Sequence, residues 1–498
     1  MGGDVEGLGF ADLHLHQHAH LAFGGRVIAG APSGELADAL ASCRAAHGPH
    51  GILDLLGNIG RVVLLGAGWR ALLGHRTTGY PAFDDWLRWD DLTHQGAHED
   101  MLRRAVDGGL RLVVMHALHN ELVYRLTPGA RGPGNDMAVV DLQLAAAHEM
   151  EASIDARSGG HGRGWYRIVR TPEEAREVIA SGRLAVVLGI EVDTLFATPG
   201  VEPTPASVRA AVAKYHDAGV RHVMPCHLRD NAFGGAAFAL LLHWSRSAGI
   251  FSTVNPLGSL PVYRMRTEPG QTDTYRYRGG HRNPRGLTDL GGVLVDELMA
   301  HGFLIDVDHM SAATRADVLD RTGARHYPVV AGHAELLTTS RPELRSERQL
   351  TDAEVARIEA AGGVVALLLR QSVQAGPATS RGTSDTFAEA YRHLLRTAPG
   401  AAGGFGSDLN GFAGSPGARA GASVQYPFPS PVGTASMPRA TLGTRTFDIA
   451  DHGVAHAGML PDFVAELRVA GLSEHELAPL LRSATRYVEM WERAMTAR

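Results

Sequence analysis

Histidines and acidic residues stand where several short apolar runs of this sequence end, and such side chains could bind metals or move protons. The first run ends in His14-Leu-His16. Because strand side chains alternate between faces, two imidazoles two residues apart point the same way and can grip one ion. The other residues at run ends are Glu191, His309, His333 and Asp408. A lone histidine at a strand end is usually an ordinary structural residue, but this whole set indicates a catalytic centre.

The set has the composition of a dinuclear metal site. Imidazole and carboxylate ligands without thiolate suit Zn²⁺, with Mn²⁺ or Co²⁺ as alternatives. We expect His14 and His16 to hold one ion, and His309 and His333 to hold the other. Glu191 follows a buried apolar run, where an unpaired carboxylate is costly, so we expect it to bridge the two divalent ions.

Two such ions would lower the pKa of a water between them enough to supply hydroxide at neutral pH. Asp408 ends Gly404-Phe-Gly-Ser-Asp408. At the edge of the ligand shell, it would take the proton of this water and hand it to a leaving amine. The residues therefore predict hydrolysis of a C–N bond in a small substrate.

Eight strand-like runs, separated by helical stretches, would position these residues. Several runs are continuously apolar, which is typical of parallel strands covered on both faces. Eight such strands predict a closed (β/α)₈ TIM barrel of the α/β class, with the site at the C-terminal ends of the strands. The runs are Gly9–His16, Leu110–Ala117, Leu184–Glu191, Val220–His227, Phe303–His309, Tyr327–His333, Gly363–Leu369 and Gly404–Asp408.

Helix boundaries and connections agree with this barrel. Thr171-Pro172, Thr351-x-x-Glu354 and Ser473-x-x-Glu476 have the pattern of helix N-termini. Glycines at 219, 302 and 362 stand where helices should end before strands. We expect one barrel domain over 1–498, with long loop insertions at 24–100, 228–286 and 409–460 on its C-terminal face. An open nucleotide-binding sheet lacks support, because no Gly-x-Gly-x-x-Gly turn follows the first run.

Composition excludes several other classes of protein. The 47 basic and 53 acidic residues give a net charge of −6 without blocks of one sign, so neither nucleic acid nor a membrane surface is an expected partner. No apolar run reaches the ~18 residues of a membrane span. Cys43 and Cys226 cannot build a disulfide framework or a cysteine-rich zinc site. The start of the chain lacks a secretion signal, so we expect a cytoplasmic protein; the oligomeric state stays open, a homodimer included.

The order of these motifs resembles the membrane (renal) dipeptidase family of zinc peptidases, in the amidohydrolase superfamily. The similarity is carried by Gly286-Leu-Thr-Asp-Leu-Gly, by Leu304-Ile-Asp-Val-Asp-His309-Met-Ser311, by Arg348-Gln-Leu-Thr-Asp352 and by Gly404–Asp408. It extends over roughly residues 184–411 and 460–498, and is weak from about 24 to 180. The resemblance implies a (β/α)₈ barrel that hydrolyses dipeptides.

The resemblance also implies roles for single residues. It makes His14 a ligand of the first metal, Glu191 the bridge, and His309 and His333 ligands of the second. It makes Asp408 the acid/base.

For the substrate, the resemblance implies that His227 contacts the scissile carbonyl, where an imidazole can face the developing oxyanion. Arg348 would bind the C-terminal carboxylate, with Arg341 as a rival because an insertion blurs the alignment. Arginine suits this task because its planar fork binds both carboxylate oxygens.

Two residues depart from the family pattern. The family has His-x-Asp where this chain has His14-Leu-His16, and usually has Asp at the position of Asn410. With one carboxylate fewer, the bound water should be more acidic and the first ion held more loosely. The prediction is a metallo-dipeptidase. The alternatives are an amidohydrolase or deaminase acting on a non-peptide amide or ring, and a non-catalytic metal-binding barrel.

Overall fold

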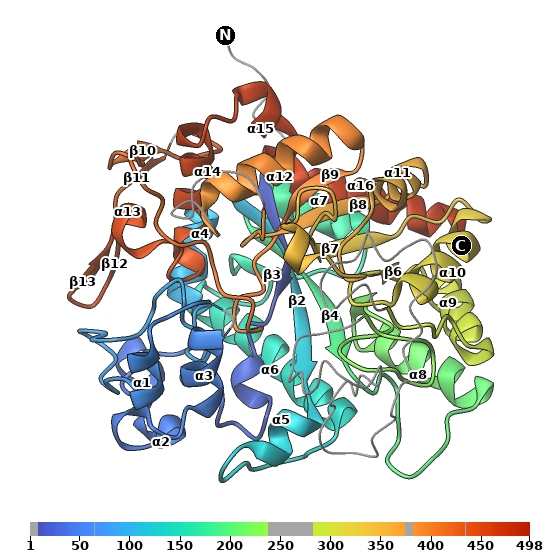
Figure 1. Ribbon diagram of the computed structural model, residues 1–498, viewed down its shortest axis with the longest axis horizontal. Helices are drawn as coiled ribbons and strands as arrows, with labels where there is room; N and C mark the ends of the chain where they lie inside the picture. Colours follow the sequence, from blue (N-terminus) through green and yellow to red (C-terminus); the bar gives the residue numbers. More distant parts are fainter. Residues whose placement is uncertain (1–7, 64, 238–281, 374–381, 434) are drawn as a thin grey trace.

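The core of the protein is a nearly closed barrel of eight parallel strands surrounded by helices (Figure 1). A computed structural model describes residues 8–63, 65–237, 282–373, 382–433 and 435–498. Around the barrel the strands follow the order β1, β2, β4, β5, β6, β7, β8, β9. A parallel bridge between Asp306 and Val330 joins β6 to β7. The strands are β1 (Phe10–Leu15), β2 (Leu110–His119), β4 (Leu184–Val192), β5 (Val220–Val223), β6 (Leu304–Ile305), β7 (Val330–Ala334), β8 (Val364–Leu368) and β9 (Ala402–Gly406).

The predicted barrel is confirmed, because each of the eight apolar runs overlaps one of its strands. Their side chains are buried except that of Arg111, as expected for strands between a packed interior and a helical layer. A further strand, β3 (Tyr166–Ile168), was not predicted. It pairs with the first residues of β4. On the same edge of β4, β5 pairs with residues further along the strand. Three residues are too few to show a periodic pattern in the sequence.

The helices that follow the strands pack around the barrel. They are α4 (Glu99–Asp107), α5 (Glu121–Leu126), α6 (Asp136–Arg157), α7 (Pro172–Ala180), α8 (Pro205–Asp217), α9 (Asp289–Ala300), α10 (Ala312–Gly323), α11 (Asp352–Ala360), α12 (Ser384–Thr397), α14 (Leu460–Val469), α15 (Glu474–Leu481) and α16 (Ser483–Ala497).

The predicted helix caps are present. Thr351 with Glu354 and Ser473 with Glu476 form reciprocal capping boxes, and the Thr171 hydroxyl accepts a hydrogen bond from the backbone of Glu174. The glycines that end helices at 219, 302 and 362 have φ of 94°, 72° and 75°, the left-handed conformation that glycine adopts without steric cost.

The long connections carry short elements of their own. After β1 come η1 (Ala19–Leu21), α1 (Leu36–Ala39), α2 (Arg44–His47), η2 (Pro49–Gly51), α3 (Leu55–Val63) and η3 (Trp69–Leu73), which Figure 1 shows in blue beside the barrel. After β9 come β10 (Phe428–Pro429), β11 (Ser436–Met437), β12 (Ala440–Leu442), β13 (Arg445–Phe447), α13 (Ile449–His452) and η7 (Ala457–Met459). A further short helix, η5 (Pro342–Leu344), follows β7. Most of the expected insertion at 228–286 lies outside the described residues.

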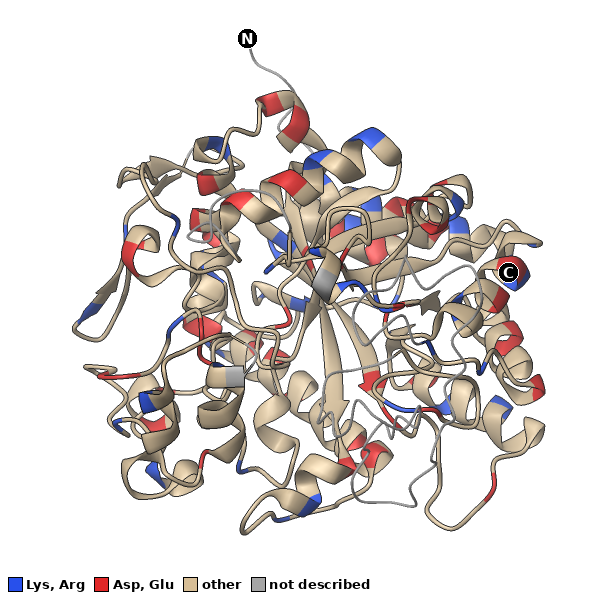
Figure 2. Cartoon of the chain, in the orientation of Figure 1, with Lys and Arg blue, Asp and Glu red and all other residues tan. Residues whose placement is uncertain are grey.

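Basic and acidic residues are interspersed along the outer helices (Figure 2). In the ranges that the structure describes, no helix is both long and apolar enough to cross a membrane.

Candidate metal centre

The carboxylate of Glu191 lies at the centre of the predicted site, near the C-terminal end of β4. Its Oε2 is 3.2 Å from Nε2 of His14 and 3.1 Å from Nε2 of His16. Its Oε1 is 3.5 Å from Nε2 of His309 and 3.5 Å from Nε2 of His227. The barrel therefore brings four imidazoles from three strand ends, those of β1, β5 and β6, around one buried carboxylate, as the sequence predicted for groups at strand tips.

His333 and Asp408 complete this group. Nε2 of His333 lies 2.8 Å from Nε2 of His309, and the ring of His333 stacks on that of His14 with centroids 3.8 Å apart. Oδ1 of Asp408 is 3.1 Å from Nε2 of His16. All seven residues predicted as ligands or as catalytic groups thus lie within one cluster.

The ligand atoms form overlapping groups that differ from the expected pairs. Three sets can each surround an ion with atoms no more than 4.8 Å apart. Glu191 and His14 each belong to two of them, so both could contribute to two ions. The sets are His14, Glu191 and His333; His14, His16 and Asp408; and Glu191, His227 and His309. The predicted assignment of single ligands to single ions stays a prediction.

The orientation of the imidazoles fits metal binding. In three of them Nδ1 lies beside an oxygen atom, and in His16 this Nδ1 donates a hydrogen bond to a backbone carbonyl; within the described residues, Nδ1 of His227 and of His333 has no hydrogen-bond partner. The Nε2 atoms face Glu191 and one another, an arrangement that a cation stabilises. The pairs are His16 with the carbonyl of His116 (3.1 Å), His227 with Asp193 (3.1 Å) and His333 with Asp308 (3.2 Å).

The electrostatics favour the protonation states that a metal requires at Glu191 and His309, but not at His16, where the contacts with Asp408 and Glu191 outweigh burial and raise the pKa to about 10. Burial alone would raise the pKa of Glu191, but the neighbouring His14 and His227 and the imidazole hydrogen bonds outweigh it and hold that pKa well below its usual range. Burial, followed by the positive charge of Arg348, holds the pKa of His309 well below its ordinary value. At neutral pH the carboxyl is therefore ionised and the His309 imidazole is neutral, as ligands must be.

The two candidate arginines differ in what surrounds them. The charge of Arg348, a half-buried residue, acts on His309 in the cluster. The charge of Arg341 acts on Arg370, and its backbone amide donates to the carbonyl of Ser372. Which of the two arginines binds a substrate carboxylate stays a prediction.

Two of the predicted site residues have unusual backbones. φ is 61° at His309 and 51° at Asp408, in the left-handed region that non-glycine residues occupy at a steric cost. Such conformations concentrate at functional sites, because the surrounding structure must hold them in place. Here they turn both side chains into the cluster at the points where β6 and β9 give way to loops.

Sequence reasoning missed a buried layer beneath the cluster. His116 of β2 stacks on His14, with ring centroids 4.3 Å apart. His222 of β5 lies with its Nε2 3.0 Å from Asp306 and its Nδ1 2.9 Å from the hydroxyl of Tyr487. The signal for Asp306 was its alternation with Asp308 in the run Leu304-Ile-Asp-Val-Asp-His309, where both carboxyls precede a predicted ligand.

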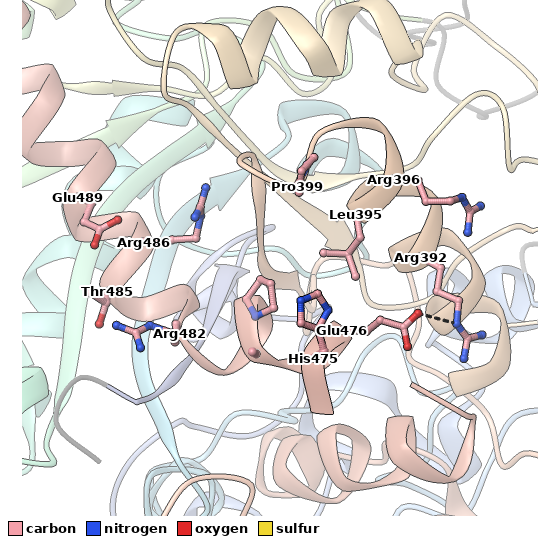
Figure 3. A pocket seen from close by; sticks show the side chains of 12 residues that line it. Arg392, Leu395, Arg396, Pro399, His475, Glu476, Arg482, Thr485, Arg486 and Glu489 are labelled. Carbon is pink, nitrogen blue, oxygen red and sulfur yellow. Dashed lines mark hydrogen bonds and ion pairs between the residues drawn. The ribbon is translucent and has the colours of Figure 1, made fainter. Parts of the chain in front are cut away.

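A separate cavity lies at the opposite end of the barrel (Figure 3). It has a volume of about 620 Å³ between α12, α15 and α16, and arginines and glutamates line it, with Glu476 3.2 Å from Arg392. Leu481, which lies in the chain between the lining residues Pro479 and Arg482, accepts a backbone hydrogen bond from Gly9 just before β1, so the cavity is near the N-terminal end of that strand. Of the residues described here, no predicted site residue lines it, so this cavity is not part of the metal centre.

Comparisons with known proteins agree with the motifs in the central part of the chain. Residues 263–423 match the model of the membrane dipeptidase family, Peptidase family M19, which confirms the resemblance seen in the sequence. An uncharacterized dipeptidase of Schizosaccharomyces pombe is 26% identical over 236 residues. That alignment covers 47% of this chain and 44% of the yeast protein, so the chain spans less than half the length of this relative.

Several solved structures resemble the fold at low identity. The dipeptidase AC, a metallopeptidase of family M19, is 20% identical with a TM-score of 0.49, over 79% of this chain and 88% of that one. A metallopeptidase of Rhodobacter sphaeroides bound to a phosphinate mimic of L-Ala-D-Ala is 20% identical, with a TM-score of 0.47 over 79% and 89% of the two chains. An amidohydrolase of Pseudomonas aeruginosa is 16% identical, with a TM-score of 0.46 over 80% and 93%. Structural similarity at these identities and TM-scores is not evidence for a shared reaction.

Proposed function

We propose that this protein is a metal-dependent dipeptidase whose centre holds two divalent ions, with Zn²⁺ the best fit to the donors. The observation that carries the proposal is the convergence of imidazole Nε2 atoms on the two oxygens of Glu191. Nitrogen and oxygen donors in this number suit Zn²⁺, and Mn²⁺ or Co²⁺ would also fit. The family match over residues 263–423 supports the choice of a dipeptide as substrate.

When bound, the ions polarise the scissile carbonyl and lower the pKa of the attacking water to supply hydroxide. The remaining steps belong to the side chains. Asp408 takes the proton of the water through a carboxylate oxygen and returns it to the leaving amine. The pKa of Asp408 favours this role: burial would raise it, but the hydrogen bond from His16 outweighs burial and keeps the carboxylate ionised and able to accept.

Two further residues would bind and orient the substrate. His227 has its Nδ1 beside Asp193 and its Nε2 turned to the cluster. This orientation suits contact with the carbonyl oxygen as negative charge develops there. Arg348 would pair with the C-terminal carboxylate, a group that distinguishes a dipeptide from a longer chain. Together these contacts would orient the peptide bond toward the carboxylate of Asp408.

The experiment is a substrate panel on purified protein whose bound metals have been quantified. Free dipeptides, N-acyl amino acids and cyclic amides are assayed side by side. Hydrolysis of dipeptides above the other classes is the expected result. Preference for a non-peptide amide would favour the alternative of a general amidohydrolase, which the His14-Leu-His16 pattern also supports. Metal binding without hydrolysis of any of these substrates would favour a non-catalytic barrel.

A further inference from the structure

A second cluster of metal-binding side chains lies in the segment between β1 and α4. Cys43, His47, His75 and His94 each present one donor atom, and these four atoms lie within 4.8 Å of one another. The cluster shares no residue with the groups around Glu191. It is buried: Cys43 and His47 are each 1% exposed, and His94 is 6% exposed.

The four residues come from three places in this segment. Cys43 is the N-cap of the short helix α2 and His47 is its last residue, one helical turn further on, so their side chains share a face. His75 follows η3, and His94 forms a parallel bridge with Ala29. A shared ion would therefore link stretches of the chain as far apart in sequence as Cys43 and His94.

Two of the histidines point into the cluster with ring nitrogens that have no hydrogen-bond partner among the described residues. Nδ1 of His94 lies 2.7 Å from Asp91, and Nε2 of His47 lies 2.9 Å from the carbonyl of Val27. These acceptors hold the proton on the outer nitrogen and leave the lone pair on the inner one. Across the described part of the chain, neither Nδ1 of His47 nor Nε2 of His94 has a hydrogen-bond partner. A buried nitrogen that has lost its hydration and makes no hydrogen bond is stabilised when it binds a metal ion.

The geometry fits a tetrahedral ion. With Zn–S of about 2.3 Å and Zn–N of about 2.0 Å, sulfur and nitrogen donors of one ion stand roughly 3.5 Å apart. Sγ of Cys43 is 3.4 Å from Nε2 of His75. The rings of His47, His75 and His94 are almost perpendicular to one another, at 87°, 85° and 77°. Three rings around one tetrahedral centre can adopt such an arrangement without clashing.

Carboxylates around the cluster would offset the charge of the ion. Asp91 lies against His94, and Oδ2 of Asp54 is 3.9 Å from nitrogens of both His47 and His75. The hydroxyl of Thr93 donates a hydrogen bond to Asp54 at 2.8 Å and fixes that carboxylate in place. One thiolate and these second-sphere carboxylates match the needs of a divalent cation.

We propose that Cys43, His47, His75 and His94 bind one structural Zn²⁺ ion, separate from the metal centre of the barrel. Four protein donors leave no open position, which distinguishes a structural site from a catalytic one. The segment needs such a fastening because α1 and α2 are only four residues long. Binding of the ion would supply folding free energy that these short helices cannot supply.

The site would also support the loop that follows Asp408. His94 precedes Gln95 and Gly96, and Asn410 contacts both: its Nδ2 donates to Oε1 of Gln95 (2.9 Å), and its Oδ1 accepts from the amide of Gly96 (3.0 Å). Nδ2 of Asn410 also lies 3.1 Å from the carbonyl of His16. Zinc at the cluster would thus hold the chain against the rim of the barrel centre.

Cobalt substitution tests the proposal without relying on activity. The barrel groups have only nitrogen and oxygen donors, so a thiolate-to-Co²⁺ charge-transfer band in the near ultraviolet can come only from a cysteine site. We expect this band in the Co²⁺-exchanged wild-type protein, its loss in Cys43→Ser, and its persistence in the matched control Cys226→Ser. Absence of the band from the wild-type protein loaded with Co²⁺, or its persistence in Cys43→Ser, would overturn the proposal even where a variant folds poorly.

Metal content separates this site from the proposed catalytic centre. Cys43→Ser and His94→Gln should each contain one equivalent of zinc fewer than the wild type. His333→Ala should lose metal from the barrel but keep the thiolate band after cobalt exchange. Limited proteolysis should cut Cys43→Ser, and not Cys226→Ser, within residues 44–93. Equal zinc content in Cys43→Ser and the wild type would contradict the proposal.

Discussion

Asp308 holds His333 through two contacts with one carboxylate oxygen. Oδ2 accepts a hydrogen bond from the backbone amide of His333 at 2.7 Å and lies 3.2 Å from Nδ1 of the same residue. The two contacts hold the residue in position, with Nε2 of the ring facing His309. A carboxylate behind a histidine in this way orients the ligand and raises its basicity.

Loss of this carboxylate should weaken metal binding without removing a ligand. Asp308→Asn keeps the size of the side chain but removes its charge, so we expect metal affinity at the barrel centre to fall about 10- to 100-fold. Competition against a chelator of known affinity measures the change. Asp217→Asn, which alters a carboxylate that is 87% exposed, is the matched control and should bind metal like the wild type. Unchanged affinity in Asp308→Asn would show that Asp308 does not support a ligand.

Removal of a ligand should have a larger effect on metal content. His309→Ala or His333→Ala should each lose about one equivalent of metal, because the remaining donors cannot complete the coordination of the ion. Elemental analysis of the purified variants measures this directly. Active wild-type protein that contains no transition metal would exclude the proposed mechanism.

Asp408 should affect turnover and not metal binding. Asp408→Asn removes the group that accepts and returns the proton, so kcat should fall roughly 10²- to 10⁴-fold, the usual size of general acid–base catalysis. Both barrel ions should remain, which elemental analysis of the same sample checks. Near-normal turnover of the best substrate by this variant would remove Asp408 from the mechanism.

Much of this centre could be predicted because parallel strands present their C-terminal ends at one face. Each of the eight runs overlaps a strand, and residues at their tips, such as His14 and Glu191, meet there as expected. The left-handed backbone of His309 and Asp408 could not be predicted, because their sequence contexts contain no signal for a positive φ. The tertiary structure imposes it.

Contacts between segments far apart in the chain could also not be predicted from the sequence. Cys43 and His47 have a spacing that suits one helix face, but His75 and His94 join them only through the path of irregular loops. That two cysteines cannot build a cysteine-rich zinc site does not exclude a site that uses a single cysteine. His116 was missed because it stands inside β2, before the strand tip where ligands were sought.

A buried histidine away from both metal sites should make stability depend on pH. Burial, together with the charges of Arg104 and Arg445, lowers the pKa of His456 to about 3. The folded protein therefore keeps His456 neutral, while the unfolded chain takes up a proton below about pH 6.5. The stability from the neutral ring is fully present above that pH and is lost as the pH falls towards 3.

The variant His456→Asn tests this dependence. An asparagine oxygen can replace Nδ1 as acceptor for the amide of Gly458, now at 3.1 Å, without titrating. Between pH 7.5 and pH 5.0, the free energy of unfolding of the wild type should fall by about 2 kcal/mol more than that of the variant. Chemical denaturation of both proteins at the two pH values measures the difference, and effects of pH on metal binding cancel. A constant difference between the proteins would contradict the low pKa of His456.

Arg348 provides the test that separates a dipeptidase from other amidohydrolases. A dipeptidase must bind a free C-terminal carboxylate, and the charge of Arg348 already acts on His309 in the cluster. Loss of a charge-assisted contact costs roughly 2–3 kcal/mol, so Arg348→Ala should lower kcat/KM for a free dipeptide about 30- to 150-fold. Dipeptide amides, which lack the charge, should be poor substrates of the wild type and change little in the variant. Arg341→Ala is the matched control, and steady-state kinetics on a dipeptide and its amide measure all three proteins. Equal activity of the wild type on both substrates would argue against carboxylate recognition and for a general amidohydrolase, whereas a selective effect in Arg341→Ala would assign the carboxylate to Arg341 and keep the dipeptidase function.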